Sequence, residues 1–334
     1  MPQPVLSVVI PVYNEEAGLP ALFARLYPAL DNLRIGYEII FVNDGSHDRS
    51  AALLRQQFER RPDVTRVVLF NANYGQHLAI MAGFQHSHGK RVVTLDADLQ
   101  NPPEEIGKLL AKMDEGYDYV GGVRAERHDT WFRRNASRLM NRLRERTTRI
   151  HMTDQGCMLR AYDRHVVEAI NLCEEANTFI PALAYTFSSN PTEVEVAHEE
   201  RAMGTTKYSL YKLVRLNFDL VTGFSLAPLQ AFSLVGFILA VSSTGVVIFQ
   251  IFHRLLRGEA AEGMFQSVTE AMQFFLFGVV LFGIGLLGEY IGRIYQEVLR
   301  RPRFIVSAVL ERHPAGEAPV AGQQPEIHQR SSVR

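Results

Sequence analysis

The sequence contains little cysteine, almost no net charge and no targeting pattern at its N-terminus. Only Cys157 and Cys173 occur among 334 residues, which argues against a disulfide scaffold and a zinc site and predicts reduced thiols. A formal net charge of −1 gives no reason to expect a nucleic-acid-binding surface. The N-terminal stretch MPQPVLSVVIPVYNEE has neither a basic segment nor a long apolar run, so we expect no signal peptide. The length is enough for about two domains with a sizeable core.

Short apolar runs alternate with helix-like segments over the first 125 residues. The expected strands are 6–12, 37–43, 64–70, 90–96 and 117–123, with a further strand at 192–198. The expected helices are 15–33, 48–60, 75–88 and 103–115. Continuous Val and Ile runs separated by helices are typical of βαβ units. We therefore predict an α/β domain with a mostly parallel sheet that is covered on both faces.

Polar side chains directly follow three of these strands. The segments are Tyr13-Asn14-Glu15, Asn43-Asp44-Gly45-Ser46 and Asp96-Ala97-Asp98. Ligands bind outside the carboxyl ends of the strands in such sheets, so the sequence predicts a binding site at that rim.

Asp96 and Asp98 are separated by one residue, and two like charges this close repel each other unless a cation lies between them. Mg²⁺ or Mn²⁺ prefers oxygen ligands and often shares its coordination shell with substrate phosphates, and Gln100 would add a neutral oxygen. The alternative is structural: Asp98 or Asn101 caps the helix that begins at Pro102-Pro103. Two further polar strand ends on the same rim favour the metal site.

Two long apolar segments follow, at 232–252 and 271–288, and neither contains a charged residue. Segments of this length match the hydrocarbon core of a bilayer, so we predict two membrane spans rather than two core helices, with both flanks on one side. Basic residues flank the pair, and they are Lys207, Lys212, Arg215, Arg293, Arg300, Arg301 and Arg303. The connection 253–270 has Arg254, Arg257 and three Glu. This bias predicts cytoplasmic flanks.

The predicted boundaries follow from these changes in composition. A catalytic domain at 1–205 is followed by juxtamembrane helices at 206–228. The transmembrane region is 229–295, with helices of about 232–252 and 271–291. A cytoplasmic return segment at 296–312 and a disordered tail at 313–334 complete the chain. Residues 208–221 mix apolar and basic side chains, which fits an interfacial helix on the membrane or a helix that docks on the soluble domain.

Residues 283–288, GIGLLG, match the dinucleotide-binding pattern G-x-G-x-x-G. That pattern requires a preceding strand and a soluble helix, whereas this copy lies inside an apolar segment. We expect these glycines, and the pair Gly288 and Gly292, to permit close helix–helix packing.

Several motifs together resemble the GT-A fold of the family 2 glycosyltransferases, which use nucleotide-diphospho-sugars. They are VVIPVYNEE, NDGSHDRS and LDADLQNPPEE. Within this family, the pair of C-terminal apolar segments is similar to that of the polyprenyl-phosphate glycosyltransferases. Four more motifs resemble the branch that transfers 4-deoxy-4-formamido-L-arabinose to undecaprenyl phosphate in lipid A modification. They are NYGQHLAIMAGF (73–84), DQGCMLRAY (154–162), ERAMGTTKYS (200–209) and GLLGEYIGRIY (285–295).

This resemblance implies an inverting, metal-dependent enzyme with a UDP-sugar donor and an undecaprenyl phosphate acceptor, which contributes to resistance to cationic antimicrobial peptides such as polymyxin. It implies a multi-pass protein of the bacterial inner membrane, surrounded by the lipid bilayer, with the catalytic domain and both termini cytoplasmic. It also implies homo-oligomers formed through the transmembrane helices.

The resemblance also implies residue roles at the matching positions. The donor nucleotide would contact Pro11, Tyr13, Asn14, Glu15, Asp44 and Asp96, and the cation would contact Asp96, Asp98 and Gln100. The catalytic residues would be Asp98 and Asp154. The phosphates or the acceptor would contact Arg124, Arg133, Ser137, Arg201 and Lys207. A solvated basic helix face accounts for most other arginines of WFRRNASRLMNRLRERTTR (131–149).

The acceptor is a phosphate monoester with a second pKa of about 6, so it is largely a dianion near neutral pH. Such a nucleophile needs positioning more than a strong base. We therefore expect Asp154 to orient the sugar or the acceptor, and the alternative is a loop or capping aspartate.

Some positions depart from the family pattern. Gln76-His77 stands where bactoprenol glucosyltransferase relatives carry Lys-Glu, which favours the aminoarabinose branch, while Ala72 and Thr153-Asp154-Gln155 leave the donor open. The single Trp131 is not part of a Gln-x-x-Arg-Trp motif, which argues against a processive synthase.

Two alternatives are the same chemistry with another sugar, such as glucose or mannose, and a non-catalytic membrane scaffold or transport accessory. The presence of the predicted metal and catalytic residues argues against the second.

Overall fold

The computed structural model describes residues 4–124, 152–154, 156–173, 179–199, 227–257, 262–299 and 302–312. The chain divides into two compact units. The first contains residues 1–138, 150–207 and 301–334, and the second contains residues 139–149 and 208–300. The predicted interfacial segment 208–221 and the predicted disordered tail 313–334 lie outside the described residues.

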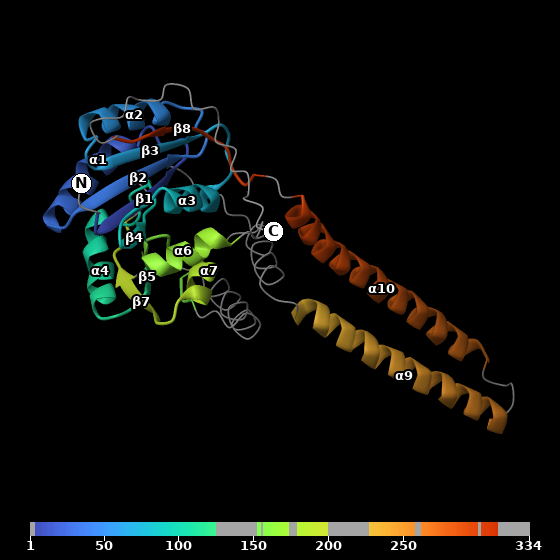
Figure 1. Ribbon diagram of the computed structural model, residues 1–334. Coiled ribbons are helices and arrows are strands. Elements are labelled where there is room, and N and C mark those ends of the chain that lie inside the picture. The colour runs from blue at the N-terminus through green and yellow to red at the C-terminus, as the bar shows by residue number, and fades with distance from the viewer. Residues whose placement is uncertain are drawn as a thin grey trace, which may run out of the picture. The chain divides into compact units, whose positions relative to one another are not determined.

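An eight-stranded mixed sheet, in the order β7-β5-β6-β4-β1-β2-β3-β8, forms the centre of the first unit (Figure 1). Its strands are β1 (Leu6–Val12), β2 (Tyr37–Asn43), β3 (Thr65–Phe70), β4 (Arg91–Thr94), β5 (Tyr119–Arg124), β6 (Arg160–Asp163), β7 (Pro191–Val196) and β8 (Val306–Leu310). Strands β4, β1, β2 and β3 are adjacent and parallel, whereas β6 and β8 run antiparallel to their neighbours. The predicted α/β class with a mostly parallel sheet is confirmed.

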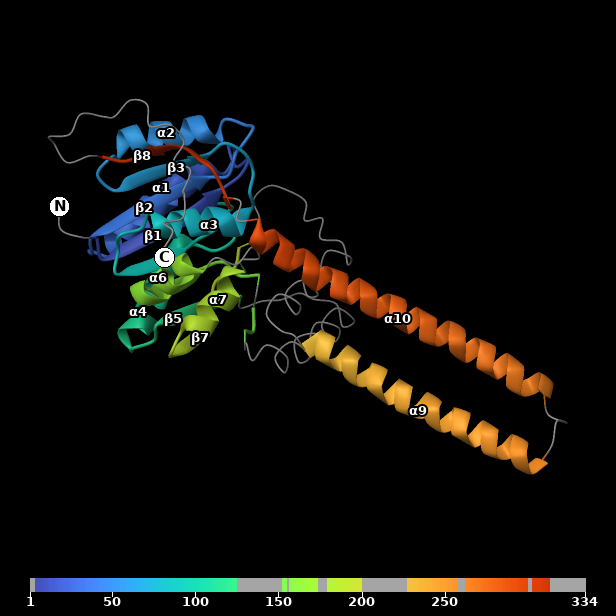
Figure 2. The same cartoon turned by 45° about the vertical axis from the view of Figure 1, so that its right-hand side comes forward.

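Helices cover both faces of this sheet (Figures 1 and 2). They are α1 (Leu19–Asn32), α2 (Ser50–Arg60), α3 (Gln76–Gln85), the short 3₁₀ helix η1 (Pro103–Glu105), α4 (Ile106–Asp114), α6 (Arg164–Leu172) and α7 (Ile180–Phe187). Alternate residues of β1 point to opposite faces, so Val8 packs in the core with α1 and α4, while Val9 faces α3. A Cβ at Gly83 would lie 2.2 Å from Val9 Cγ1, so glycine is what lets α3 approach β1 this closely.

The sequence prediction missed two strands and misplaced some boundaries. β6 and β8 were not predicted, because β6 is a short Arg-Ala-Tyr-Asp segment and β8 lies within the predicted return segment. The predicted strand 90–96 ends at Thr94, since Leu95 and the following residues leave the sheet in a turn. The predicted helix 15–33 begins only at Leu19, because residues 13–16 form the loop at the end of β1.

The second unit contains two long helices, α9 (Ala227–Arg257) and α10 (Glu262–Val298), which run side by side in Figures 1 and 2. Each includes an 18-residue window apolar enough to cross a membrane, Leu229–Val246 with a mean hydropathy of 1.7 and Phe275–Gly292 with 1.9. Buried residues make up 0% and 11% of these windows, unlike a helix in a soluble core. These are therefore two candidate membrane-spanning helices.

The glycines of the apolar segment differ in their surroundings. A Cβ at Gly283 would lie 2.2 Å from the ring of Phe232, so this glycine permits close contact between α9 and α10, as predicted. Among the described residues, and apart from the adjacent backbone of α10 itself, no atom lies within 4 Å of a Cβ placed on Gly285, Gly288 or Gly292. Within the described hairpin, the prediction of close packing was therefore wrong for Gly285 and for the pair Gly288 and Gly292.

Candidate active site

The candidate site lies at the carboxyl ends of β4, β1, β2 and β3. These ends lie next to one another because the four strands are adjacent and parallel. The structure therefore brings the three predicted polar segments to one rim, and the loop after β3, residues 71–75, joins them.

Asp44 is buried and accepts hydrogen bonds from the loop after β3. Its Oδ1 accepts from the Tyr74 N–H at 2.7 Å, and its Oδ2 accepts from the Gly75 N–H at 2.9 Å and from Asn73 Nδ2 at 3.0 Å. Burial raises the pKa of Asp44, and the backbone hydrogen bonds from Tyr74 and Gly75 oppose this effect. The carboxylate thus fixes the 71–75 loop against the end of β2.

Gly45 permits this close approach of the two loops. Its φ of +64° lies in the left-handed region, and a Cβ would lie 2.3 Å from the carbonyl carbon of Ala72. Any other residue would strain the backbone and collide with that loop, so Asp44 and Gly45 act together.

The loop after β1 is tied to the loop after β2. Asn14 has a φ of 54°, its N–H donates to Ser46 Oγ at 3.0 Å, and its Oδ1 accepts from the His47 N–H at 2.9 Å. Tyr13 is 43% exposed, and its ring meets that of His47 edge-on at 6.4 Å. An exposed aromatic ring on a fixed loop can stack on a ligand ring.

Pro11, near the end of β1, and Glu15, in the loop after it, are the remaining predicted nucleotide residues of this part of the rim. β4 pairs with β1 only as far as Val9 and Thr94, so the missing N–H of Pro11 interrupts no pairing with β4. The Glu15 N–H donates to Ser50 Oγ at 3.0 Å. Glu15 Oε2 and the Ala97 carbonyl oxygen lie 3.4 and 3.8 Å from the position of a Cβ on Gly18, so the Glu15 side chain is near the turn after β4.

That turn carries Asp96 and Asp98, which are both half-buried. Asp96 Oδ1 accepts from Gln76 Nε2 at 2.7 Å, and Asp98 Oδ1 accepts from the Gln100 N–H at 3.1 Å. The following helices η1 and α4 have no side-chain hydrogen bond at their N-caps, which are Pro102 and Glu105. Helix capping therefore does not account for Asp98.

The residues of this turn suit a cation that is shared with a ligand. Two carboxylates and a side-chain amide, on Asp96, Asp98 and Gln100, are the oxygen donors that Mg²⁺ and Mn²⁺ prefer. In the described part of the chain, no three or more His, Cys, Asp or Glu side chains are grouped to hold a metal ion. A cation here would depend on water and on substrate phosphates for its other ligands.

Asp154 is 1% exposed and forms a bidentate ion pair with Arg124. Arg124 Nε donates to Oδ2 at 2.6 Å and Nη2 donates to Oδ1 at 2.8 Å, and the Gly156 N–H also donates to Oδ1 at 3.1 Å. The carboxylate is thus engaged with groups of the protein itself. This arrangement suits an orienting residue, and Arg124 is the group that it orients.

Three residues near the rim were missed by the sequence analysis. Arg160 is fully buried in β6, and its guanidinium donates to the Asp154 carbonyl oxygen at 2.6 Å and the Cys157 carbonyl oxygen at 2.7 Å. His198 follows β7, and its pKa is lowered, first by burial and then by the nearby Arg124. Gln76 contacts Asp96 as described. For Gln76, the sequence signal was the departure from the family pattern at Gln76-His77. Arg160 gave no signal, because a buried arginine has no characteristic sequence pattern.

His77 and Cys157 lie close to these groups, and both side chains are neutral at pH 7. Burial, followed by the charge of Arg160, lowers the pKa of His77 to about 4, so its ring is neutral at pH 7. The ring contacts Phe179 edge-on at 5.1 Å. Burial raises the pKa of the Cys157 thiol to about 11, so it is not a thiolate nucleophile.

The remaining predicted phosphate and acceptor residues, Arg133, Ser137, Arg201 and Lys207, lie outside the described residues.

A mostly parallel sheet with an Asp-x-Asp turn beside two further polar strand ends defines a glycosyltransferase of the GT-A class. The chain belongs to glycosyl transferase family 2, whose model matches residues 7–170. The resemblance drawn from the motifs is confirmed.

Two relatives match most of the chain. This chain is 50% identical over 309 residues to the undecaprenyl-phosphate 4-deoxy-4-formamido-L-arabinose transferase of Serratia proteamaculans (strain 568). The matched region covers 92% of this chain and 95% of that relative. The chain is 49% identical over 308 residues to the protein of the same name from Aeromonas hydrophila subsp. hydrophila, with coverage of 92% and 94%. Among solved structures, glucosyl-3-phosphoglycerate synthase from Mycobacterium tuberculosis with Mn²⁺, uridine diphosphate and glucosyl-3-phosphoglycerate has 17% identity and a TM-score of 0.49, covering 67% of this chain and 79% of that one.

Proposed function

We propose that this glycosyltransferase moves 4-deoxy-4-formamido-L-arabinose from UDP to undecaprenyl phosphate with inversion of configuration, in the lipid A modification that the sequence motifs imply. The observation that carries this proposal is the 50% identity to a transferase of that name, which extends over 92% of this chain. Because the match covers 92% of the 334 residues, it leaves out about 27 residues, fewer than the 31 residues of α9 alone, so it includes part of the apolar hairpin.

In this proposal the donor nucleotide binds along the loops after β1 and β2. Tyr13 offers its exposed ring to the uracil, and the loop of Asn14 and Glu15 lies beside it. Asp44 acts by holding the 71–75 loop and shaping the same end of the site. The diphosphate then lies at the turn of Asp96 and Asp98.

A divalent cation, Mg²⁺ or Mn²⁺, held by Asp96, Asp98 and Gln100 would stabilise the negative charge that develops on the departing UDP. Gln76 donates to Asp96, which orients that side chain. The acceptor phosphate is already a good nucleophile, so Arg124, oriented by Asp154, would position it for in-line displacement. Arg133, Ser137, Arg201 and Lys207 are proposed as its further contacts.

We also propose that α9 and α10 span the inner membrane as a hairpin, with the catalytic unit and both ends of the chain in the cytoplasm. Their apolar windows and the basic flanks support this orientation. A membrane anchor in the same chain as the catalytic unit suits an acceptor whose phosphate lies at the membrane surface. Homo-oligomers through these helices are a further part of the proposal.

The test uses the purified full chain in lipid nanodiscs with undecaprenyl phosphate, Mg²⁺ or Mn²⁺, and a panel of donors. The panel contains the UDP-linked formamido-arabinose, UDP-glucose and GDP-mannose, and the product is identified by mass spectrometry. We expect transfer from the first donor and loss of transfer with EDTA. Asp98→Ala should lower the rate by about 10²-fold or more, because a charged ligand for the cation is lost.

A matched control is Asp114→Ala. Asp114 is an exposed carboxylate paired with Arg91 at 2.6 Å, at the opposite end of β4 from Asp98, so its loss should leave transfer unchanged. Transfer that persists in EDTA would contradict the cation site, and transfer only from another donor would contradict the sugar. No transfer from any donor would favour the scaffold alternative.

A further inference from the structure

Residues 302–312, which follow α10, extend the sheet of the first unit at its β3 edge. They are the described part of the predicted return segment 296–312 that lies beyond α10, and below the name return segment refers to residues 302–312 alone. Its strand β8 runs antiparallel to β3, with Leu310 opposite Val67 and Val306 opposite Phe70. The start of the return segment therefore lies at the carboxyl end of β3, where the candidate site is, and its end lies at the opposite end of β3.

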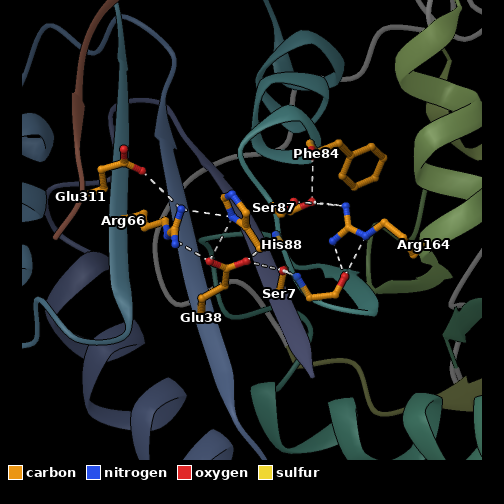
Figure 3. Close-up of polar contacts among 9 residues, drawn as sticks. Ser7, Glu38, Arg66, Phe84, Ser87, His88, Arg164 and Glu311 are labelled. Carbon is orange, nitrogen blue, oxygen red and sulfur yellow. Dashed lines mark hydrogen bonds and ion pairs between the residues drawn. The ribbon is translucent and has the colours of Figure 1, made fainter. Parts of the chain in front are cut away.

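The far end of the return segment is held by a network of charged groups (Figure 3). Glu311 Oε2 accepts from Arg66 Nη1 at 3.3 Å, and Arg66 Nε pairs with Oε2 of the buried Glu38 at 2.9 Å. Glu38 Oε1 in turn accepts from Ser7 Oγ and from the His88 N–H, both at 2.6 Å. This network fixes the strand to the sheet, far from the polar rim.

The near end of the return segment contacts the loop after β3. The ring of Phe304 stacks on that of Phe70, with centroids 4.9 Å apart and planes 19° apart. The Asn71 N–H donates to the Ile305 carbonyl oxygen at 3.2 Å. Phe304 and Ile305 thus contact the two residues with which β3 ends and the loop begins.

These contacts continue to Asp44. Phe70 meets the ring of Tyr74 edge-on at 5.6 Å, and the Tyr74 hydroxyl donates to Asn71 Oδ1 at 2.7 Å. The backbone N–H of the same Tyr74 donates to Asp44 Oδ1 at 2.7 Å. A continuous series of contacts therefore joins the return segment to a buried carboxylate of the candidate site.

We infer that Phe304 and Ile305 position the 71–75 loop and, through it, Asp44, so that the segment after the membrane hairpin is a working part of the donor-nucleotide site. The role of Asp44 in nucleotide binding rests on the proposed function, whereas the coupling from Phe304 to Tyr74 and Asp44 does not. Residues far apart in sequence, on the two sides of the hairpin, thereby build one site.

The test compares UDP binding by the full chain and its Phe304→Ala, Phe304→Tyr, Glu311→Gln and Asp44→Ala variants, measured by isothermal titration calorimetry. Phe304→Ala should raise the Kd for UDP about 3- to 10-fold, the range expected for loss of one aromatic stack. Phe304→Tyr retains the stack and should bind like the parent. Glu311→Gln removes the ion pair at the far end of the same segment and should change the Kd less than about twofold.

Hydrogen exchange supplies a second measurement that does not depend on ligand. The amides of Tyr74 and Gly75 donate to Asp44, so we expect faster exchange at both in Phe304→Ala and parent-like exchange in Glu311→Gln. Unchanged exchange and unchanged UDP binding in Phe304→Ala would overturn the inference, as would equal losses in Phe304→Ala and Glu311→Gln. Parent-like UDP binding by Asp44→Ala would instead contradict the proposed donor site, and exchange would still decide the coupling.

Discussion

At the residue scale, the carboxylates of the rim fall into two groups that differ in burial. Asp44 and Asp154 are 2% and 1% exposed, and each accepts several hydrogen bonds from the chain itself. Asp96 and Asp98 are half-buried in the turn after β4. A buried, fully bonded carboxylate fixes its neighbours, whereas a partly exposed one can still exchange water for a ligand. The first pair therefore fixes the shape of the rim, and the second pair is the one proposed to bind the cation.

His77 predicts how stability depends on pH. Its pKa is about 4 in the folded chain and near 6.5 when unfolded, so between these values the unfolded state binds more protons. The free energy of unfolding is therefore highest above pH 6.5, where His77 is neutral in both states. It decreases as the pH falls from 6.5 toward 4, because the unfolded state then binds the extra proton. We expect a lower Tm at pH 5.0 than at pH 7.0, measured by differential scanning fluorimetry, and a smaller difference in His77→Gln.

A matched variant separates this effect from general acid sensitivity. His47→Gln changes an exposed histidine, whose ring loses little hydration on folding, and should keep the parent's difference in Tm. If His77→Gln keeps that difference as well, burial of the His77 ring does not contribute to the acid sensitivity.

At the scale of elements, the hairpin offers two glycines of the same helix in different surroundings. A side chain at Gly283 would meet the Phe232 ring of α9, while one at Gly285 would meet no atom of the described residues within 4 Å. We expect Gly283→Leu to separate the helices and lower the Tm of the detergent-solubilised protein by several degrees, since a well-packed contact is replaced by overpacking of about 1–3 kcal/mol. Gly285→Leu should leave the Tm nearly unchanged. Equal effects of the two variants would show that the contact with Phe232 does not stabilise the hairpin.

The elements also show what the sequence could predict. β1, β2 and β3 are continuous apolar runs, so their positions and the polar residues after them followed from pattern alone. β6 could not be predicted, because it is only four residues long and begins with Arg160. This arginine is buried in the folded chain, where it donates to the Asp154 and Cys157 carbonyl oxygens and to the Tyr119 hydroxyl of β5. The partners of Asp44 and Asp154 were likewise missed. They come from residues about 30 positions away in the chain, and only the tertiary fold brings them together.

At the scale of the whole molecule, the chain leaves the first unit, forms the hairpin of the second and returns to the first as β8. This path requires both ends of the hairpin to be on the same side of a membrane, if the two helices span it. The distribution of basic residues supports the same topology, because three precede the apolar segment 232–252 and four follow the segment 271–288, against two in the connection 253–270. The strand pairing and the charge bias are separate observations, and both support the hairpin topology proposed above.

The topology can be tested with single cysteines in a cysteine-free background. The variants Cys157→Ala and Cys173→Ala remove both native thiols, after which Ala260→Cys marks the connection between the helices and Ser331→Cys marks the C-terminal tail. In spheroplasts treated with a membrane-impermeant maleimide, we expect labelling of Ala260→Cys at once and of Ser331→Cys only after the membrane is permeabilised. The reverse pattern would place the catalytic unit outside the cytoplasm, contrary to the charge bias. Immediate labelling of both sites would show that α10 does not cross the membrane, contrary to the proposed hairpin.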